Sequence, residues 1–148
     1  MAQRAATHVE IALQSGMRFE AFNEDDISVT LDAPPKYGGS GTGFGPMQML
    51  LIGLGGCTGM DVISILRKKR QDVTGYRIEV TGIQAEEHPR MFTDISIKHL
   101  LTGNNLSDEA VKRSIELSEA KYCGALTMLE KAARISSTYE IQPAPPED

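Results

Sequence analysis

The chain has 148 residues, of which 41% are hydrophobic, so it can bury one ordinary core without a metal or a crosslink. We therefore expect a single domain over residues 1–148. Its formal net charge of -5, from 15 basic and 20 acidic residues, opposes binding to nucleic acid and to anionic membranes. Residues 1–13 include Arg4, His8 and Glu10 and no apolar stretch of the kind that secretion requires, so we expect a cytoplasmic protein.

The N-terminal third predicts a sheet followed by a loop. Residues 8–13, 18–22 and 27–31 have strand-like patterns, and turn-forming residues separate them, which indicates a three-stranded meander. Residues 33–45 are rich in glycine and contain Pro34 and Pro35, so they can form neither a helix nor the interior of a sheet. We expect a flexible surface loop that leads into a central helix.

The central helix is predicted to begin at Pro46 and to end in the basic run at residues 67–70, whose charges complement the carbonyl end of the helix dipole. Residues 49–60 carry no charge, but this run is far shorter than the roughly 20 residues of a membrane span, so it indicates a buried helix. A glycine costs a helix interior about 1 kcal/mol relative to alanine. The run nevertheless contains four glycines, Gly53, Gly55, Gly56 and Gly59. Their presence predicts that another backbone or helix packs very closely against this part of the helix.

The second half predicts two strands, at residues 76–84 and 93–101, and then helices. Ser107 is a plausible helix cap, and the residues after it repeat at helical spacing on one face, namely Val111, Ile115, Ser118 and Tyr122. A shorter helix is expected at residues 125–134 and a last strand at 138–141. Because the strands come in hairpin pairs, the fold class should be α+β with a largely antiparallel sheet.

Several familiar sites are excluded by spacing. The glycine-rich loop has neither the GxGxxG nor the GK[ST] pattern of phosphate-binding loops. The three histidines are far apart, and neither cysteine has another cysteine two to four residues away, so a closed zinc site is not expected. The chain also has no GxSxG motif, which leaves a serine hydrolase without its nucleophile.

The two cysteines are the candidate reactive groups, although free cysteines are often inert core residues. Cys57 stands among glycines that leave room for a small substrate. Cys123 precedes Gly124, near the start of the last helix, whose N-terminal amides favour a thiolate. Asp61 comes one helical turn after Cys57 and would oppose ionisation of this thiol if both face the same way. A thiol in the middle of a helix therefore needs a cation supplied from elsewhere.

A set of short segments spans nearly the whole chain, namely residues 46–50, 55–58, 61–66, 70–73, 89–93, 121–123 and 128–132. Together these segments resemble the OsmC/Ohr family, the osmotically induced and organic hydroperoxide resistance proteins, and most closely its YhfA-like branch. It implies an OsmC-like fold with a long central helix. It also implies an intertwined homodimer whose central helices pack together, with an active site at the subunit interface.

The resemblance also implies a reaction. Cys57 would attack the O–O bond of an organic hydroperoxide as a thiolate and become a sulfenic acid, and Cys123 would resolve it as a disulfide. A dithiol partner of the lipoyl type would reduce the disulfide. No metal and no organic cofactor is implied.

This chain departs from the catalytic members at one position. In the catalytic members a glutamate comes directly after the proline and anchors the arginine that supports the thiolate. Here Met47 and Gln48 come after Pro46. Gln48 can hydrogen-bond a guanidinium but cannot hold it by charge, so the peroxidase would be slow. Arg18 is the first candidate for the arginine, and Arg90 is the second. The alternative is a non-catalytic dimeric protein that binds a small ligand in an apolar cavity.

Overall fold

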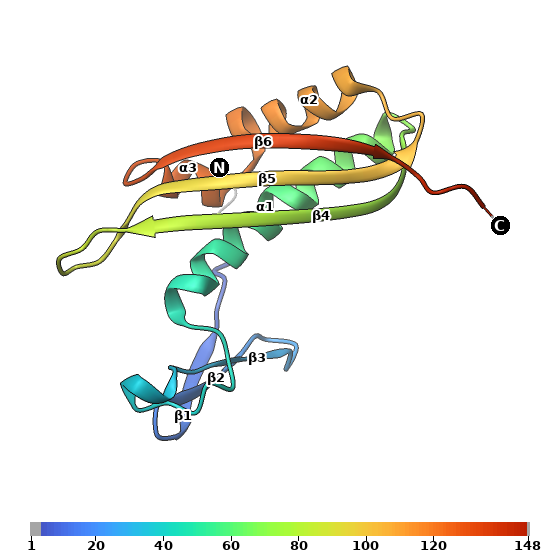
Figure 1. Ribbon diagram of the computed structural model, residues 1–148. Helices are drawn as coiled ribbons and strands as arrows, with labels where there is room; N and C mark the ends of the chain where they lie inside the picture. The colour runs from blue at the N-terminus through green and yellow to red at the C-terminus, as the bar shows by residue number, and fades with distance from the viewer. Residues whose placement is uncertain (1–3, 148) are drawn as a thin grey trace. The chain divides into compact units, whose positions relative to one another are not determined.

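The computed structural model describes residues 4–147, which form two compact units that meet in sequence between Leu50 and Leu51. Each unit contains one three-stranded sheet (Figure 1). The N-terminal unit holds β1 (Glu10–Ser15), β2 (Arg18–Phe22) and β3 (Ser28–Leu31). The long helix α1 (Pro46–Lys68) begins in this unit and continues into the next. The strands of the C-terminal unit are β4 (Asp72–Gln84), β5 (Phe92–Asn104) and β6 (Arg134–Pro143).

The N-terminal strands form the predicted meander. Strand β2 pairs antiparallel with both β1 and β3. Gly16 has a φ of 51° in the β1–β2 turn, a conformation that glycine adopts without strain. The Asn23 side chain accepts hydrogen bonds from the backbone N–H groups of Asp25 and Ile27, which closes the β2–β3 turn.

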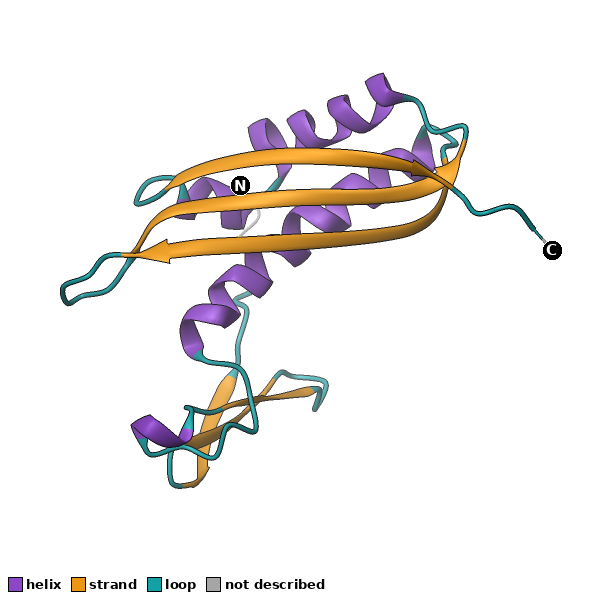
Figure 2. Cartoon of the chain, in the orientation of Figure 1, coloured by secondary structure: helices purple, strands orange, loops and turns teal. Residues whose placement is uncertain are grey.

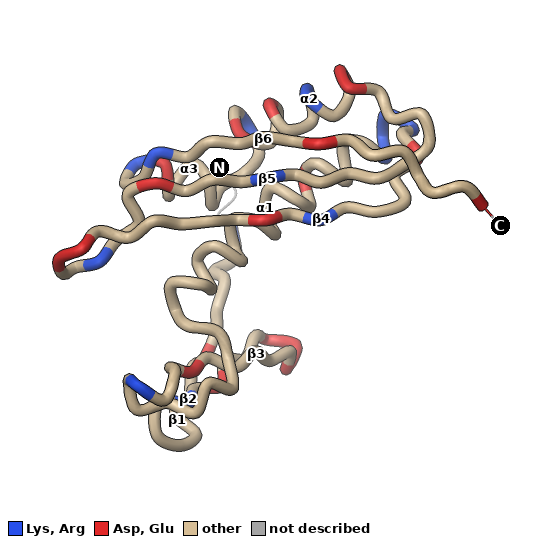
Figure 3. Tube along the Cα trace, in the orientation of Figure 1, with Lys and Arg blue, Asp and Glu red and all other residues tan. Residues whose placement is uncertain are grey.

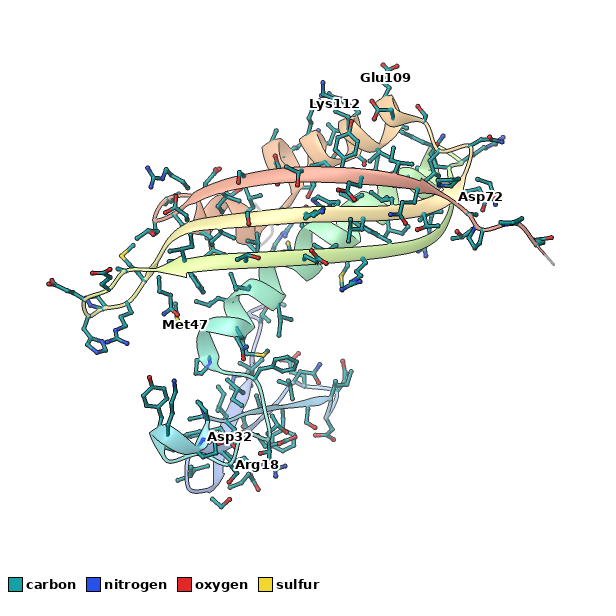
Figure 4. All side chains as sticks on the ribbon, viewed as in Figure 1. Arg18, Asp32, Met47, Asp72, Glu109 and Lys112 are labelled. Atoms are coloured by element: carbon teal, nitrogen blue, oxygen red, sulfur yellow. The ribbon has the colours of Figure 1, made fainter. Side chains whose placement is uncertain are left out.

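The loop after β3 is organised around one buried carboxylate, that of Asp32 (Figure 4). It accepts four hydrogen bonds, from the backbone N–H groups of Ala33, Ser40 and Thr42 and from the hydroxyl of Thr42. The hydroxyl bond, followed by the backbone bonds, lowers the pKa of Asp32 to about 2. The loop also contains a short 3-10 helix, Pro35–Tyr37. The expectation that residues 33–45 contain no helix is therefore wrong, because the backbone N–H groups of Tyr37 and Gly38 donate to the carbonyl oxygens of Pro34 and Pro35 and close this short helical turn.

Helix α1 packs on the C-terminal sheet through Leu54, Val62 and Leu66, all fully buried. Its length and composition would also allow a membrane span, but a core helix passes the same test. A Cβ added at Gly59 would lie 2.5 Å from the Ile78 side chain of β4, and one at Gly55 would lie 2.9 Å from Val80. The predicted close packing is thus found at these two glycines, where a strand rather than a helix is the neighbour.

The C-terminal sheet has the strand order β4-β5-β6. Strands β4 and β5 form a long antiparallel hairpin, whereas β6 pairs with β5 in parallel, with Arg134 opposite Asp94 and Pro143 opposite Gly103. Three of the four strand pairs in the described residues are antiparallel, so the prediction of a largely antiparallel arrangement is confirmed, and β5–β6 is the exception. Helices intervene between β5 and β6 and return the chain to the start of β5, which makes the parallel pairing possible.

The helices of the C-terminal unit lie on one face of its sheet (Figure 2). Helix α2 (Asp108–Leu117) contributes Val111 and Ile115 to a core that includes Leu66 and, from β5, Leu101. Ser107 caps it as predicted, since its hydroxyl accepts a hydrogen bond from the backbone N–H of Ala110 at 3.2 Å. Acidic and basic residues are interspersed along the strands of the C-terminal sheet (Figure 3), as the scattered charges of the sequence indicate.

The segment after α2 departs from the prediction. A π-helical turn, η2 (Ser118–Tyr122), follows directly, and α3 (Gly124–Leu129) is shorter than the helix expected at residues 125–134. Strand β6 begins at Arg134 and is correspondingly longer than the strand expected at residues 138–141. The difference arises because β6 pairs with β5 along its whole length. Polar residues at alternating exposed positions can belong to such a long strand.

Candidate active site

Cys57 and Cys123 are both free thiols, and their sulfur atoms form a cluster with a carboxylate oxygen of Asp61. The three atoms all lie within 4.8 Å of one another. Cys57 is half-buried, whereas Cys123 is only 1% exposed. Residues from two distant parts of the sequence, both in the C-terminal unit, therefore meet at one point beside α1.

Helix α1 positions two members of the cluster. Cys57 and Asp61 are one turn apart, so they project from the same face of the helix. The condition stated from the sequence, that Asp61 faces the same way as Cys57, is met. Gly56, the residue before Cys57, has open space where its Cβ would be.

The π turn η2 positions the third member. The backbone N–H of Cys123 donates to the carbonyl oxygen of Ser118 at 2.8 Å, five residues back instead of four. The wider turn places Cys123 in the interior and leaves Tyr122 52% exposed. The α-helical spacing had placed Tyr122 on the buried face, and this prediction is wrong because the turn contains one more residue than an α-helical turn.

Three polar side chains link α1 to η2 beside the cysteines. The Ser118 hydroxyl donates to the Asp61 carboxylate at 2.9 Å. Its oxygen lies 2.9 Å from the hydroxyl of Thr58, and since the single Ser118 hydrogen is directed to Asp61, Thr58 is the donor in this second bond. Thr58 and Ser118 are both fully buried. The network fixes the Asp61 carboxylate against η2.

The environment of Cys123 keeps its thiol protonated at neutral pH. Burial raises the pKa of Cys123 to about 11, and the nearby Cys57 sulfur and the Asp61 charge act in the same direction. The backbone N–H of Leu126 donates to the Cys123 sulfur at 3.3 Å and opposes this shift only in part. The predicted benefit of the α3 amides is therefore present but smaller than the effect of burial.

A hollow of about 250 Å³ opens on the surface beside the cluster. Its lining consists of Asp61, Ser64, Ile65, Lys68, Leu117 and Tyr122. Since Asp61 belongs both to this lining and to the sulfur cluster, the hollow brings solvent to the edge of the site. Lys68 provides a cationic side chain on its wall.

Two of the predicted residues that accompany the cysteines, Arg18 and Gln48, belong to the N-terminal unit. Arg18 is the exposed first residue of β2 (Figure 4). The Gln48 side-chain oxygen accepts a hydrogen bond from the backbone N–H of Gly45 at 2.8 Å, so it caps the first turn of α1. Arg90, the second candidate cation, is exposed in the loop between β4 and β5. The roles of Arg18 and Gln48 in the site stay predictions.

The sequence reasoning did not assign Thr58 or Ser118 to the site. Thr58 could have been noticed as the one polar residue of the apolar run, because a buried hydroxyl requires a partner. Ser118 carried no comparable signal, since its place opposite α1 depends on how α2 crosses the sheet.

The comparisons with known proteins agree with this architecture. The family model described as OsmC-like protein matches residues 39–138. The chain is 47% identical over 96 residues to Protein YhfA of Escherichia coli K12, a match that covers 65% of this chain and 72% of YhfA. The chain belongs to the OsmC-like family. The predicted family resemblance and the α+β, OsmC-like fold class are thus confirmed.

Solved structures extend the comparison to the OsmC-like fold as a whole. A hypothetical protein from Aquifex aeolicus VF5 has a TM-score of 0.84 at 29% identity, over 96% of this chain and 100% of that one. An organic hydroperoxide resistance protein OsmC from Legionella pneumophila has a TM-score of 0.67 at 11% identity, over 94% of this chain and 99% of that one. These likenesses show the fold, and the name YhfA gives no function.

Proposed function

We propose that the protein is a cysteine-dependent peroxidase that reduces organic hydroperoxides in the defence against oxidative stress. The observation that carries the proposal is the meeting of two free sulfur atoms within 4.8 Å, one half-buried and one buried. A pair with this asymmetry provides one thiol for the substrate and a second one for the intermediate. Membership of a family that contains organic hydroperoxide resistance proteins supports the choice of substrate.

Cys57 is the peroxidatic residue. Its thiolate attacks the terminal oxygen of R–O–OH, the O–O bond breaks, and an alcohol leaves with one proton from solvent, so Cys57 becomes a sulfenic acid. Cys57 is assigned this role because its side chain is only half-buried. Cys123 is too deeply buried to meet a bulky peroxide first.

Cys123 is the resolving residue. Its sulfur attacks the sulfenic sulfur of Cys57, a disulfide forms, and the hydroxyl leaves as water with the thiol proton. The distance between the two sulfur atoms, which is within 4.8 Å, must shorten to about 2.05 Å when the disulfide forms. This requires only a local adjustment of η2 or α3. A dithiol of the lipoyl type then exchanges with the disulfide, is itself oxidised to a cyclic disulfide, and returns both cysteines to thiols.

Arg18 supports the Cys57 thiolate in this proposal, with Gln48 in the place of the family glutamate. The Gln48 oxygen already accepts a bond from Gly45, so its contribution to the guanidinium is weak. We therefore expect slow turnover, and an Arg18→Ala variant should lower it further. A Gln48→Glu variant should raise it, because a carboxylate can hold the guanidinium by charge as well as by hydrogen bonding.

The active form is a homodimer in this proposal. The face of α1 that carries Gly53, Gly56 and Met60 is open, since a Cβ at either glycine would meet nothing within 4 Å and Met60 is 74% exposed. Small residues beside a large apolar one allow another backbone to approach closely. Exposed apolar side chains of β1, namely Ile11 and Leu13, add to the surface that association would cover.

Turnover provides the test. Reduced protein is supplied with cumene hydroperoxide and a dihydrolipoyl dithiol, and loss of the peroxide is followed. The proposal expects catalytic loss that Cys57→Ser abolishes, whereas Cys123→Ser permits one oxidation and then stalls. If the wild-type protein consumes no peroxide beyond the uncatalysed rate, it is not a peroxidase, and the non-catalytic ligand-binding function becomes the better account.

A further inference from the structure

The two sulfur atoms do not form their cluster alone. A carboxylate oxygen of Asp61 lies within 4.8 Å of both, and the three side chains come from two separate segments of the C-terminal unit. A disulfide needs only the sulfurs, so the carboxylate is an additional feature. Two cysteine sulfurs and one carboxylate oxygen are together a ligand set that suits zinc.

The cluster is held by its surroundings. Cys57 and Asp61 are one turn apart within the 23 residues of α1, which fixes their spacing. The buried Ser118 hydroxyl donates to Oδ2 of Asp61 at 2.9 Å, so Oδ1 is not engaged by this hydrogen bond. A ligating carboxylate is commonly oriented by such an outer hydrogen bond. Cys123 is fixed by its position between η2 and α3.

We propose that the reduced protein binds one zinc ion per chain through the sulfurs of Cys57 and Cys123 and an oxygen of Asp61. Zinc–sulfur bonds of about 2.3 Å and zinc–oxygen bonds of about 2.0 to 2.2 Å place neighbouring ligands of a tetrahedral site about 3.5 to 3.8 Å apart. The three atoms therefore need to move together by about 1 Å. The hollow beside Asp61 gives a water molecule access to the fourth position.

Spacing along the sequence could not reveal this site. The sequence contains no pair of cysteines two to four residues apart, and we expected no metal for that reason. In this site the Asp61 carboxylate, one helical turn from Cys57, stands where a zinc motif would have its second, closely spaced cysteine. Cys123 is distant in sequence, and the fold brings it to the site. Zinc would occupy both sulfurs, so the metal-bound protein would resist oxidation at these two positions. The binding itself does not depend on the peroxidase proposal.

The test uses reduced protein under anaerobic conditions. Cobalt(II) is added as a spectroscopic probe, and zinc is then titrated against a chromophoric chelator. We expect one equivalent of zinc per chain, and a cobalt complex with thiolate charge-transfer absorption and the visible bands of a four-coordinate ion. Asp61→Asn keeps an oxygen that can accept the hydrogen bond from Ser118, so this variant should fold. Its zinc binding should be at least tenfold weaker than that of the wild type.

Matched variants complete the design. Cys57→Ser removes one of the two thiolate ligands and should lower the cobalt charge-transfer absorption to about half or less, whereas Glu79→Gln, which removes an exposed carboxylate on β4, should bind like the wild type. Circular dichroism verifies that each variant is folded. The proposal is overturned if the wild type binds no zinc, if the cobalt spectrum of Cys57→Ser is as intense as that of the wild type, or if Asp61→Asn binds zinc as tightly as the wild type.

Discussion

His99 on β5 provides a quantitative prediction, because it is a fully buried histidine with only one polar partner. One ring nitrogen, Nδ1, hydrogen-bonds the hydroxyl of Tyr76, while Nε2 has no partner among the described residues. Burial lowers the pKa of His99 from 6.5 to about 4. The folded state therefore holds this ring neutral at pH values where the unfolded chain would protonate it.

The size and sign of the effect follow from linkage. A folded pKa below the unfolded one means that the unfolded chain binds more protons, so the contribution is fully present above about pH 6.5 and is lost as the pH falls towards 4. The difference of about 2.5 pH units corresponds to about 3 kcal/mol of unfolding free energy in total. About 2.5 kcal/mol of it is already lost at pH 4.5.

The assay compares urea unfolding of the wild type and of His99→Gln at pH 7.5 and pH 4.5, at one fixed protein concentration. Glutamine can donate to or accept from Tyr76, and any pH-independent cost of the substitution cancels within each protein. Carboxylates that titrate in the same interval are common to both proteins. We expect the wild type to lose about 2.5 kcal/mol more than the variant between the two pH values. Equal losses would refute the argument that His99 is buried in its neutral form.

Two further substitutions test local features. Ser107→Ala removes the hydroxyl that caps α2 and should lower the free energy of unfolding by about 1 kcal/mol, measured in urea; an unchanged midpoint would mean that the cap contributes nothing. Met60→Glu places a charge on the open face of α1 and should convert the proposed dimer to a monomer in size-exclusion chromatography with light scattering. A Glu79→Gln control should keep the wild-type mass, and an unchanged mass for Met60→Glu would exclude this face as the interface.

The parts of the fold that depend on local interactions could be predicted from the sequence. The N-terminal meander, the start of α1 at Pro46 and the cap at Ser107 follow from turn residues, proline geometry and side-chain hydrogen bonding over a few positions. The close approach at Gly55 and Gly59 was also predicted, because glycine in a helix needs a packing reason.

The parts of the fold that depend on contacts between distant residues could not be predicted from the sequence. Strand β6 is extended and parallel because β5 offers it a complete edge, and nothing within residues 134–143 indicates this. Resemblance to a family singled out Cys57 and Cys123, but the position of Cys123 beside Cys57 and Asp61 follows from the π turn at η2, which α-helical periodicity cannot anticipate. Asp32 likewise organises a loop whose composition indicated only flexibility.

The formation of a disulfide between Cys57 and Cys123 tests the central claim most directly. Reduced protein is treated with one equivalent of cumene hydroperoxide under denaturant-free conditions, the remaining thiols are alkylated, and the cross-linked peptides are mapped by mass spectrometry. The account predicts that both thiols disappear together and that one peptide joins these two residues within a single chain. Rapid peroxide consumption with both thiols still free, or a link that always joins two chains, would contradict it.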